Sequence, residues 1–173
     1  EDLRISLLAN KMVTEVTDYG AGAGSKEEIA YQKKIADIAA RNAKPAKWGK
    51  LLYRLAKYFA AGDILELGTS LGISAAYIAW GAKHNGSNIN FHSIEGSPNL
   101  AEMAGINLKN LGLEDEVKVV CGKFRDVLPK ILDSYPSLDL VFIDGDHRKE
   151  PTLEYFKQIL PKAHNDTIFI FDD

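Results

Sequence analysis

Cysteine is nearly absent from this sequence, and so are long apolar runs. Cys121 is the only cysteine among 173 residues, which excludes an intrachain disulfide and a zinc site built from several cysteines. No apolar run approaches the ~20 residues that a membrane-spanning helix needs, and the opening stretch EDLRISLLAN lacks the basic region of a signal peptide. We therefore expect a cytoplasmic protein with no membrane partner.

An excess of positive charge is lacking as well. The 24 Asp and Glu residues outnumber the 21 Lys and Arg residues, the formal net charge is −3, and no long run of Lys or Arg occurs. A nucleic-acid partner is therefore not expected, and a small-molecule partner is favoured. The hydrophobic share of 46% suits one compact domain with a substantial core.

From residue 61 onward the sequence alternates regularly between short apolar runs and helix-like segments. This alternation predicts an α/β fold, with a parallel sheet covered by helices. The predicted strands cover residues 63–67, 90–95, 117–121, 138–143 and 167–171. The predicted helices cover residues 72–83, 98–111, 124–133 and 150–161.

The first 60 residues are predicted to form a mainly helical extension that packs on a core made of residues 61–173, the whole being one domain. Ser25 and Glu28 have the spacing of a capping box, and Ile29, Ile35 and Ile38 would form the apolar stripe of the helix after it. Residues 11–16, KMVTEV, are compatible with a short strand. A second helix is expected to cover the sheet with five side chains at helical spacing, namely Trp48, Leu51, Leu52, Leu55 and Phe59.

The stretch Gly68-Thr69-Ser70-Leu71-Gly72 satisfies the G-x-S-x-G pattern of a hydrolase nucleophile. Such a serine normally comes after several strands, whereas here a mainly helical segment precedes the first clear strand, so we do not expect Ser70 to be a nucleophile. The dinucleotide-binding pattern G-x-G-x-x-G also fails, because Ser70 and Ile73 occupy positions where the backbone must approach a pyrophosphate. The remaining interpretation of these residues is a glycine-rich turn that lies beside some other ligand.

Acidic residues lie on or directly after the predicted strands. Glu66 lies on the first strand and Glu95 ends the second, where a carboxylate can accept hydrogen bonds from both hydroxyls of a ribose. With E-L-G-T-S-L-G and I-E-G in these places, residues from about 45 to 173 resemble the class I S-adenosylmethionine-dependent methyltransferases. More narrowly, LDLVFIDGDHRKEPTLEYF and IFIFDD are similar to small-molecule O-methyltransferases.

The resemblance implies a Rossmann-like doubly wound sheet with strand order 3-2-1-4-5, and two further strands, 6 and 7, beyond the fifth. It implies S-adenosylmethionine as cofactor, with the methionine part beside the glycine turn and the ribose on Glu95. A small hydroxylated molecule would be the methyl acceptor, and a homodimer is compatible with the family. The residues implied in cofactor binding are Glu66, Gly68, Ser70, Gly72, Glu95, Gly122, Phe124 and Asp144.

One departure from the family concerns adenine. The family usually carries an acid after the third strand, but this chain has Cys121-Gly122-Lys123-Phe124, and Lys123 cannot accept a hydrogen bond from the adenine amino group. Backbone groups together with Phe124, or Asp126 reaching back, are the alternatives, and Phe124 is equally compatible with a core position.

The last acidic group comprises Asp144, Asp146, Asp172 and Asp173, which come after the fourth and fifth strands. Clustered carboxylates favour a hard divalent cation such as Mg²⁺. We predict Asp144, Asp172 and Asp173 as its ligands; the alternative is that Asp172 or Asp173 caps the next element of the chain and Asp146 is solvated. His147 stands where the similar enzymes carry a lysine, so Asp144 and His147 are the predicted catalytic residues, with His147 as general base or, alternatively, an ordinary surface residue.

Two other functions remain open from the sequence. One is a non-catalytic S-adenosylmethionine-binding or regulatory domain, which would bind the cofactor without turnover. The other is a nicotinamide-dependent oxidoreductase, which Ser70 and Ile73 disfavour.

Overall fold

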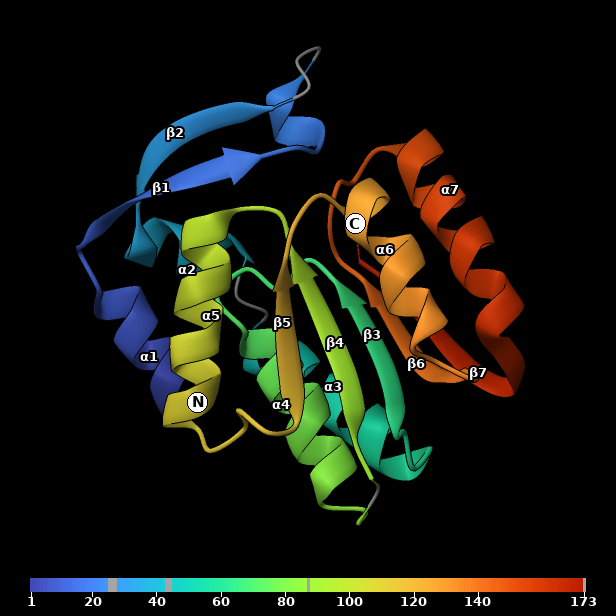
Figure 1. Ribbon diagram of the computed structural model, residues 1–173. Helices are drawn as coiled ribbons and strands as arrows, with labels where there is room; N and C mark the ends of the chain where they lie inside the picture. The colour runs from blue at the N-terminus through green and yellow to red at the C-terminus, as the bar shows by residue number, and fades with distance from the viewer. Residues whose placement is uncertain (25–27, 43–44, 87, 173) are drawn as a thin grey trace.

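The computed structural model describes residues 1–24, 28–42, 45–86 and 88–172, and its centre is a five-stranded parallel sheet (Figure 1). The strands are arranged in the order β5-β4-β3-β6-β7. Their bounds are β3 Asp63–Leu67, β4 Asn90–Glu95, β5 Val117–Cys121, β6 Leu138–Ile143 and β7 Ala163–Phe171. Counted from Asp63, this is the predicted order 3-2-1-4-5. The labels β6 and β7 denote its fourth and fifth strands, not the two further strands that the resemblance implies.

Helices cover both faces of the sheet, as predicted (Figure 1). One face carries α3 (Ala46–Tyr58), α4 (Ile73–Lys83) and α5 (Pro98–Asn110), and the other carries α6 (Phe124–Asp133) and α7 (Lys149–Ile159). A short 3-10 turn, η2 (Leu160–Lys162), leads from α7 into β7, which begins at Ala163 rather than at the predicted residue 167. Because all five strands are parallel, their carboxyl ends lie at the same edge of the sheet.

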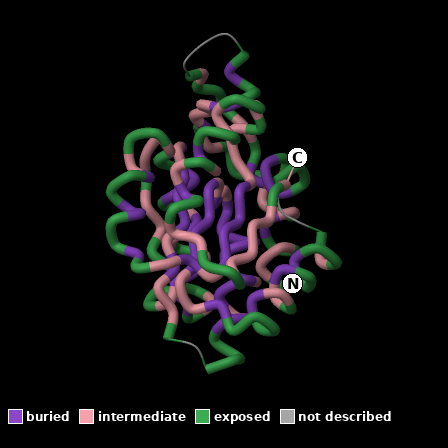
Figure 2. Tube along the Cα trace, turned by 90° about the vertical axis from the view of Figure 1, so that its right-hand side faces the viewer, coloured by how far each residue is buried: buried purple, intermediate pink, exposed green. Residues whose placement is uncertain are grey.

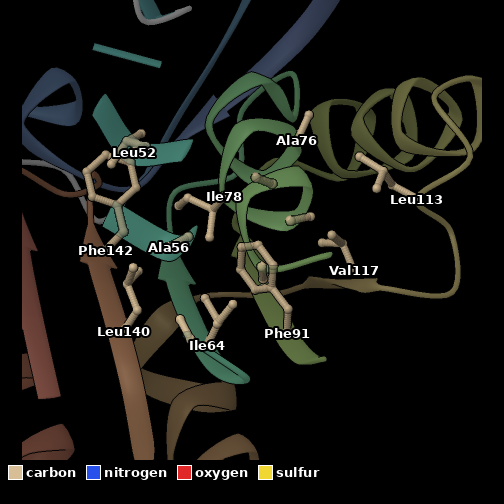
Figure 3. Packing of buried hydrophobic residues seen from close by; sticks show 14 of the residues in the cluster. Leu52, Ala56, Ile64, Ala76, Ile78, Phe91, Leu113, Val117, Leu140 and Phe142 are labelled. Carbon is tan, nitrogen blue, oxygen red and sulfur yellow. The ribbon is translucent and has the colours of Figure 1, made fainter. Parts of the chain in front are cut away.

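The alternation of side chains along each strand builds two separate cores. On β3, Ile64 packs with α3 and α4, whereas the next residue, Leu65, packs with α6 and α7. Figure 3 shows the first of these cores, with Ile64 and Phe91 pointing from the sheet toward Ile78 of α4. Ile64 and Phe91 are both fully buried. The central strand β3 is thus covered on both faces, and this makes it a rigid support for the turn after it.

The N-terminal region differs from the prediction. It contains α1 (Asp2–Ala9), β1 (Val13–Asp18), η1 (Ala21–Ala23), β2 (Ile29–Lys34) and α2 (Ile35–Asn42). β1 confirms the short strand, but residues 29–34 form the antiparallel partner of β1, with Asp18 opposite Ile29, and not the start of a helix. The predicted capping residue Ser25 lies outside the described residues. Pairing with β1 decided the conformation of residues 29–34, and local apolar spacing does not reveal that pairing.

The β1–β2 hairpin stands apart from the buried centre of the molecule. In Figure 2 the buried residues concentrate in the central strands, whereas most hairpin residues are exposed or half-buried. Within the two strands themselves, Val16 of β1 is the buried residue, and with Ile38 of α2 it packs against Leu71 and Leu100. The hairpin is therefore attached next to the glycine turn and to α5.

Helix α3 forms as predicted but covers the sheet with fewer side chains. Leu52 is buried, whereas Trp48 is 48% exposed, Leu51 36% and Phe59 45%. The close contact with α4 runs instead through small residues, because Gly49 of α3 and Gly81 of α4 leave no space for a Cβ atom. None of the helices in the described part of the chain is both long and apolar enough to cross a membrane.

Candidate functional site

A cavity of about 800 Å³ opens at the carboxyl ends of the parallel strands. This edge is where open α/β sheets bind their ligands. Gly68 after β3, Glu95 at the end of β4 and Asp144 after β6 all line it. One part of the wall comes from the N-terminal region, through Val16, Thr17, Asp18, Tyr19, Gly20, Gly24, Arg41 and Asn42.

The turn after β3 is held in an unusual conformation. Gly68 has φ +103°, and a Cβ atom there would lie 2.2 Å from the carbonyl oxygen of Asp144. Ser70 and Gly72 also have positive φ, at +50° and +80°. Only glycine combines the φ of Gly68 with so close an approach, so Gly68 brings the turn directly against the end of β6. The residues of this turn from Gly68 to Leu71 thereby form part of the cavity wall.

Glu95 is nearly buried, and its carboxylate is hydrogen-bonded both to the turn after β3 and to the start of α5. Oε2 accepts a hydrogen bond from the backbone N–H of Ser70 at 2.7 Å, and Oε1 accepts one from the backbone N–H of Ser97 at 2.8 Å. Burial raises the pKa of Glu95, while these backbone donors oppose the increase. Each carboxylate oxygen has a second lone pair, so Glu95 retains the capacity to accept hydrogen bonds from a ligand in the cavity.

Glu66, which was predicted to bind the cofactor, lies below the turn and is not among the residues that line the cavity. It is fully buried, and burial raises its pKa to about 7. Ser93 donates a hydrogen bond to Glu66 Oε2, and Thr69 Oγ1 lies 2.5 Å from Ser93 Oγ. Hydrogen bonds from the side chains of Ser74 and Ser93 oppose this increase in the pKa of Glu66. The structure therefore gives Glu66 a supporting position beneath the glycine turn.

Among the residues that the structure describes, Ser70 has no partner that would activate it as a nucleophile. Its Oγ accepts a hydrogen bond from Nδ2 of Asn42 at 3.4 Å. Within the described ranges no histidine is hydrogen-bonded to Ser70 Oγ. A nucleophilic serine needs an adjacent general base, so the geometry agrees with a serine that contributes its backbone to the turn.

The turn after β6 is also strained. Asp146 and His147 are consecutive non-glycine residues with positive φ, +69° and +56°. Such conformations cost about 1–3 kcal/mol each and persist where surrounding contacts enforce them. Arg148 donates hydrogen bonds from Nε and Nη2 to the Asp146 carboxylate, and the Tyr155 hydroxyl donates to Asp146 Oδ2 at 3.1 Å. Asp146 is thus not solvated: its side chain is 6% exposed, and the strained turn leaves His147 at the cavity.

The N-terminal region is joined to this strained turn by its backbone. Ala21 N–H donates to the Asp146 carbonyl oxygen at 2.7 Å, and Arg148 Nη2 donates to the Tyr19 carbonyl oxygen at 2.9 Å. A Cβ atom at Gly20 would lie 2.6 Å from the same Asp146 oxygen. Sequence reasoning missed this wall of the site. The glycine-rich stretch from Gly20 to Gly24 was its only local sign.

The predicted metal ligands are partly in place. Asp144 and Asp172 both line the cavity, and Asp172 N–H donates to the Ile143 carbonyl oxygen at 3.0 Å, which keeps the ends of β6 and β7 together. Asp173 lies outside the described residues. Among the residues that the structure does describe, no three His, Cys, Asp or Glu side chains come together as a metal site. The three-ligand site therefore stays a prediction.

The other predicted residues separate into two groups. Gly68, Ser70, Glu95, Phe124, Asp144 and His147 line the cavity. Gly72 and Gly122 do not line it: Gly72 lies against Ala104 of α5, and Gly122 lies against Val127 of α6. Asp126, the alternative partner for adenine, is also outside the lining, and its side chain is 62% exposed.

The family model described as "Methyltransferase domain" matches residues 65–173. The chain is 35% identical to the catechol O-methyltransferase of Mycobacterium tuberculosis over 133 residues, which make up 77% of this chain and 57% of that protein. It is also 35% identical to the catechol O-methyltransferase of Niastella koreensis, over 72% of this chain and 55% of that protein. The chain thus spans a little more than half the length of these relatives.

Solved structures of O-methyltransferases share the fold. The O-methyltransferase from Bacillus cereus in complex with SAH has a TM-score of 0.71 and 30% sequence identity, over 77% of this chain and 59% of that one. TomG from Streptomyces achromogenes, in complex with SAM, has a TM-score of 0.68 and 30% identity, over 76% of this chain and 57% of that one.

Proposed function

The chain belongs to the methyltransferase domain family, and on that premise we propose that it binds S-adenosylmethionine and transfers a methyl group to a hydroxyl oxygen of a small molecule. The observation that carries the proposal is the placement of Glu95. Its carboxylate lies at the end of β4, faces the cavity and is joined to the backbone of the glycine turn after β3. This arrangement fits a cofactor that has both a ribose and an amino-acid part. The carboxylate of Glu95 would accept hydrogen bonds from the ribose hydroxyls, and the turn after β3 would lie beside the amino-acid part.

The chain's own residues fit each part of the cofactor. Glu95 would accept hydrogen bonds from the ribose hydroxyls, and the backbone at Gly68 and Ser70 would pass the methionine part. Phe124 lines the same cavity and would contact the adenine. Described residues between Val16 and Asn42 line the same cavity as residues of the core, which supports one domain made of residues 1–60 and 61–173.

When bound, the cofactor supplies a methyl group on a positively charged sulfur. The protein's contribution is to position the acceptor oxygen and to remove its proton, and positioning alone can lower a barrier by ~7–11 kcal/mol. His147, exposed at the cavity on its strained turn, is the proposed proton acceptor. Asp144 lies between this turn and the glycine turn, where it would orient the acceptor hydroxyl.

We further propose that Asp144, Asp172 and Asp173 hold a divalent cation such as Mg²⁺. Carboxylate oxygens are the ligands that this ion prefers. Asp144 and Asp172 come directly after neighbouring strands, which lie about 4.8 Å apart. A cation there would favour the deprotonated form of an acceptor hydroxyl. Two relatives are named catechol O-methyltransferases, so a dihydroxylated aromatic compound is the first acceptor to test.

The test has two stages and uses the full-length chain. Calorimetric titration should show binding of S-adenosylhomocysteine (SAH) and S-adenosylmethionine but not of NAD. Transfer of a labelled methyl group to catechol, or to another member of a panel of hydroxylated compounds, should then be measurable. Binding of NAD without SAH would refute the proposal, and SAH binding without turnover on any acceptor would favour a non-catalytic binding domain.

A further inference from the structure

Two glycines at the cavity each lie against an aromatic ring. A Cβ atom on Gly96, the residue after β4, would be 2.7 Å from Cδ2 of Tyr19. A Cβ atom on Gly145, two residues after β6, would be 2.8 Å from Cε2 of Phe124. With contacts this short, a side chain at either position would displace the ring. Both rings therefore pack directly on backbone at strand ends, and both line the same cavity as Glu95.

Tyr19 is held in this position from several sides. Its carbonyl oxygen accepts a hydrogen bond from Arg148 at 2.9 Å, and Lys123 Nζ lies 4.7 Å from the centre of its ring. Lys123 in turn forms an ion pair with Glu28 at 3.0 Å. Lys123 stands near the position where the family usually carries an acid. It thus contacts the N-terminal region twice, through its ion pair with Glu28 and through its ammonium group over the Tyr19 ring.

The position of Tyr19 along the cavity matches one part of the cofactor. Glu95, the proposed ribose acceptor, directly precedes Gly96, and consecutive Cα atoms are about 3.8 Å apart. The base of a nucleoside is bonded to its ribose, so an adenine on the Gly96 side of that ribose would lie against the Tyr19 ring. Aromatic side chains stack on bases without reading their hydrogen-bonding edges, and each such contact contributes ~1–3 kcal/mol.

We propose that Tyr19 contacts the adenine of the cofactor, and that this aromatic contact takes the place of the missing acid after β5. The inference rests on the proposed function and names a residue of the same site. It makes the segment after β1 part of the cofactor site, with Lys123 orienting Tyr19 and not binding adenine itself. It also accounts for Gly96, since any side chain there would displace the Tyr19 ring.

The experiment compares Tyr19→Phe, Tyr19→Leu and the parent chain by calorimetric titration with SAH and with 5′-methylthioadenosine. Phenylalanine keeps the ring, so its affinities should stay within about twofold of the parent, whereas leucine keeps apolar volume without a ring and should lose about tenfold. The loss should be the same for both ligands, because they share the adenosine part. Tyr58→Leu is the matched control: Tyr58 is 82% exposed on α3, outside the cavity, and its replacement should change neither affinity.

The outcomes separate this inference from the proposed function. A parent chain that binds SAH and a Tyr19→Leu variant that binds it equally well, or better, would refute the role of Tyr19 alone. If Tyr19→Phe lost as much affinity for SAH as Tyr19→Leu, the aromatic contact would be refuted and the hydroxyl group of Tyr19 would be the part that matters. Failure of the parent chain to bind SAH would refute the proposed function itself.

Discussion

The side chain of Glu95 is hydrogen-bonded to the backbone of Ser70, across the gap between two neighbouring strand ends. The Oε2 atom of Glu95 lies 2.7 Å from the Ser70 nitrogen. The proposed ribose acceptor therefore also fixes the turn that would pass the methionine part of the cofactor. One carboxylate thus links the two halves of the proposed cofactor site.

Replacing Glu95 should weaken cofactor binding. Glu95→Gln keeps the size of the side chain but removes the charge, and hydrogen bonds to charged groups contribute about 1.5–3 kcal/mol. We expect the affinity for SAH to fall at least tenfold in calorimetric titration. Glu102→Gln is the control, because Glu102 is exposed on α5 and lies outside the cavity. Unchanged affinity in Glu95→Gln would show that the ribose assignment is wrong.

Replacing Ser70 should have little effect on binding or turnover. Ser70→Ala removes the hydroxyl and its 3.4 Å contact with Asn42, but it keeps the backbone N–H that donates to Glu95. We expect SAH affinity within about twofold of the parent, because neither that backbone donor nor the ligand-facing side of Glu95 changes. Methyl transfer should also persist. Covalent labelling of Ser70 by a fluorophosphonate, abolished in Ser70→Ala, would contradict this role.

Glu66 should make the folded state less stable as the pH rises. Its pKa in the folded protein is about 7, against 4.5 for an ordinary glutamate, so the folded state holds a proton that the unfolded state releases. The stabilising contribution of this group is therefore fully present below pH 4.5 and is lost as the pH rises to about 7, by about 3 kcal/mol in total.

Glu66→Gln, which mimics the protonated form, should remove this dependence. Denaturant unfolding between about pH 4 and pH 8, a range that brackets both pKa values, should show the variant close to the parent at low pH and more stable at high pH. Glu114→Gln, at an exposed loop position, is the control. A constant difference between Glu66→Gln and the parent across this range would contradict a raised pKa for Glu66.

Removing the proposed cation or one of its ligands should reduce methyl transfer. The full-length chain is treated with excess EDTA, and Asp172→Ala is assayed beside it. We expect a large loss of turnover in both, restored by Mg²⁺ in the parent only, with SAH affinity largely kept because Glu95 is untouched. Asp133→Ala, exposed at the end of α6, should behave as the parent. Full activity in EDTA together with full activity of Asp172→Ala would exclude the metal.

The core of the site could be predicted because its signals are local. The strands at 63–67 and 138–143 are short apolar runs, and Gly68 and Asp144 come directly after them, so their meeting at one sheet edge needs only the parallel order. The same argument predicts Glu95 at the cavity. Glu66 lies outside the cavity lining, which the sequence did not reveal, because alternation along a strand says which face a residue takes but not how far the covering helix separates that face from the cavity. Its role in cofactor binding stays a prediction.

The rest of the site was decided by tertiary contacts between segments far apart in the chain. Ile29 lies in a strand because Asp18 is opposite it, and Tyr19 lies at the cavity because Arg148, 129 residues later, binds its carbonyl oxygen. Asp146 is turned away from solvent by Arg148 and Tyr155. The sequence by itself determined the sheet, the glycine turn and the acidic strand ends, since each depends on neighbouring residues and a fixed period. Only the tertiary structure decided how the N-terminal region closes the cavity, because hydrogen bonds and ring contacts over such separations leave no periodic pattern in the sequence.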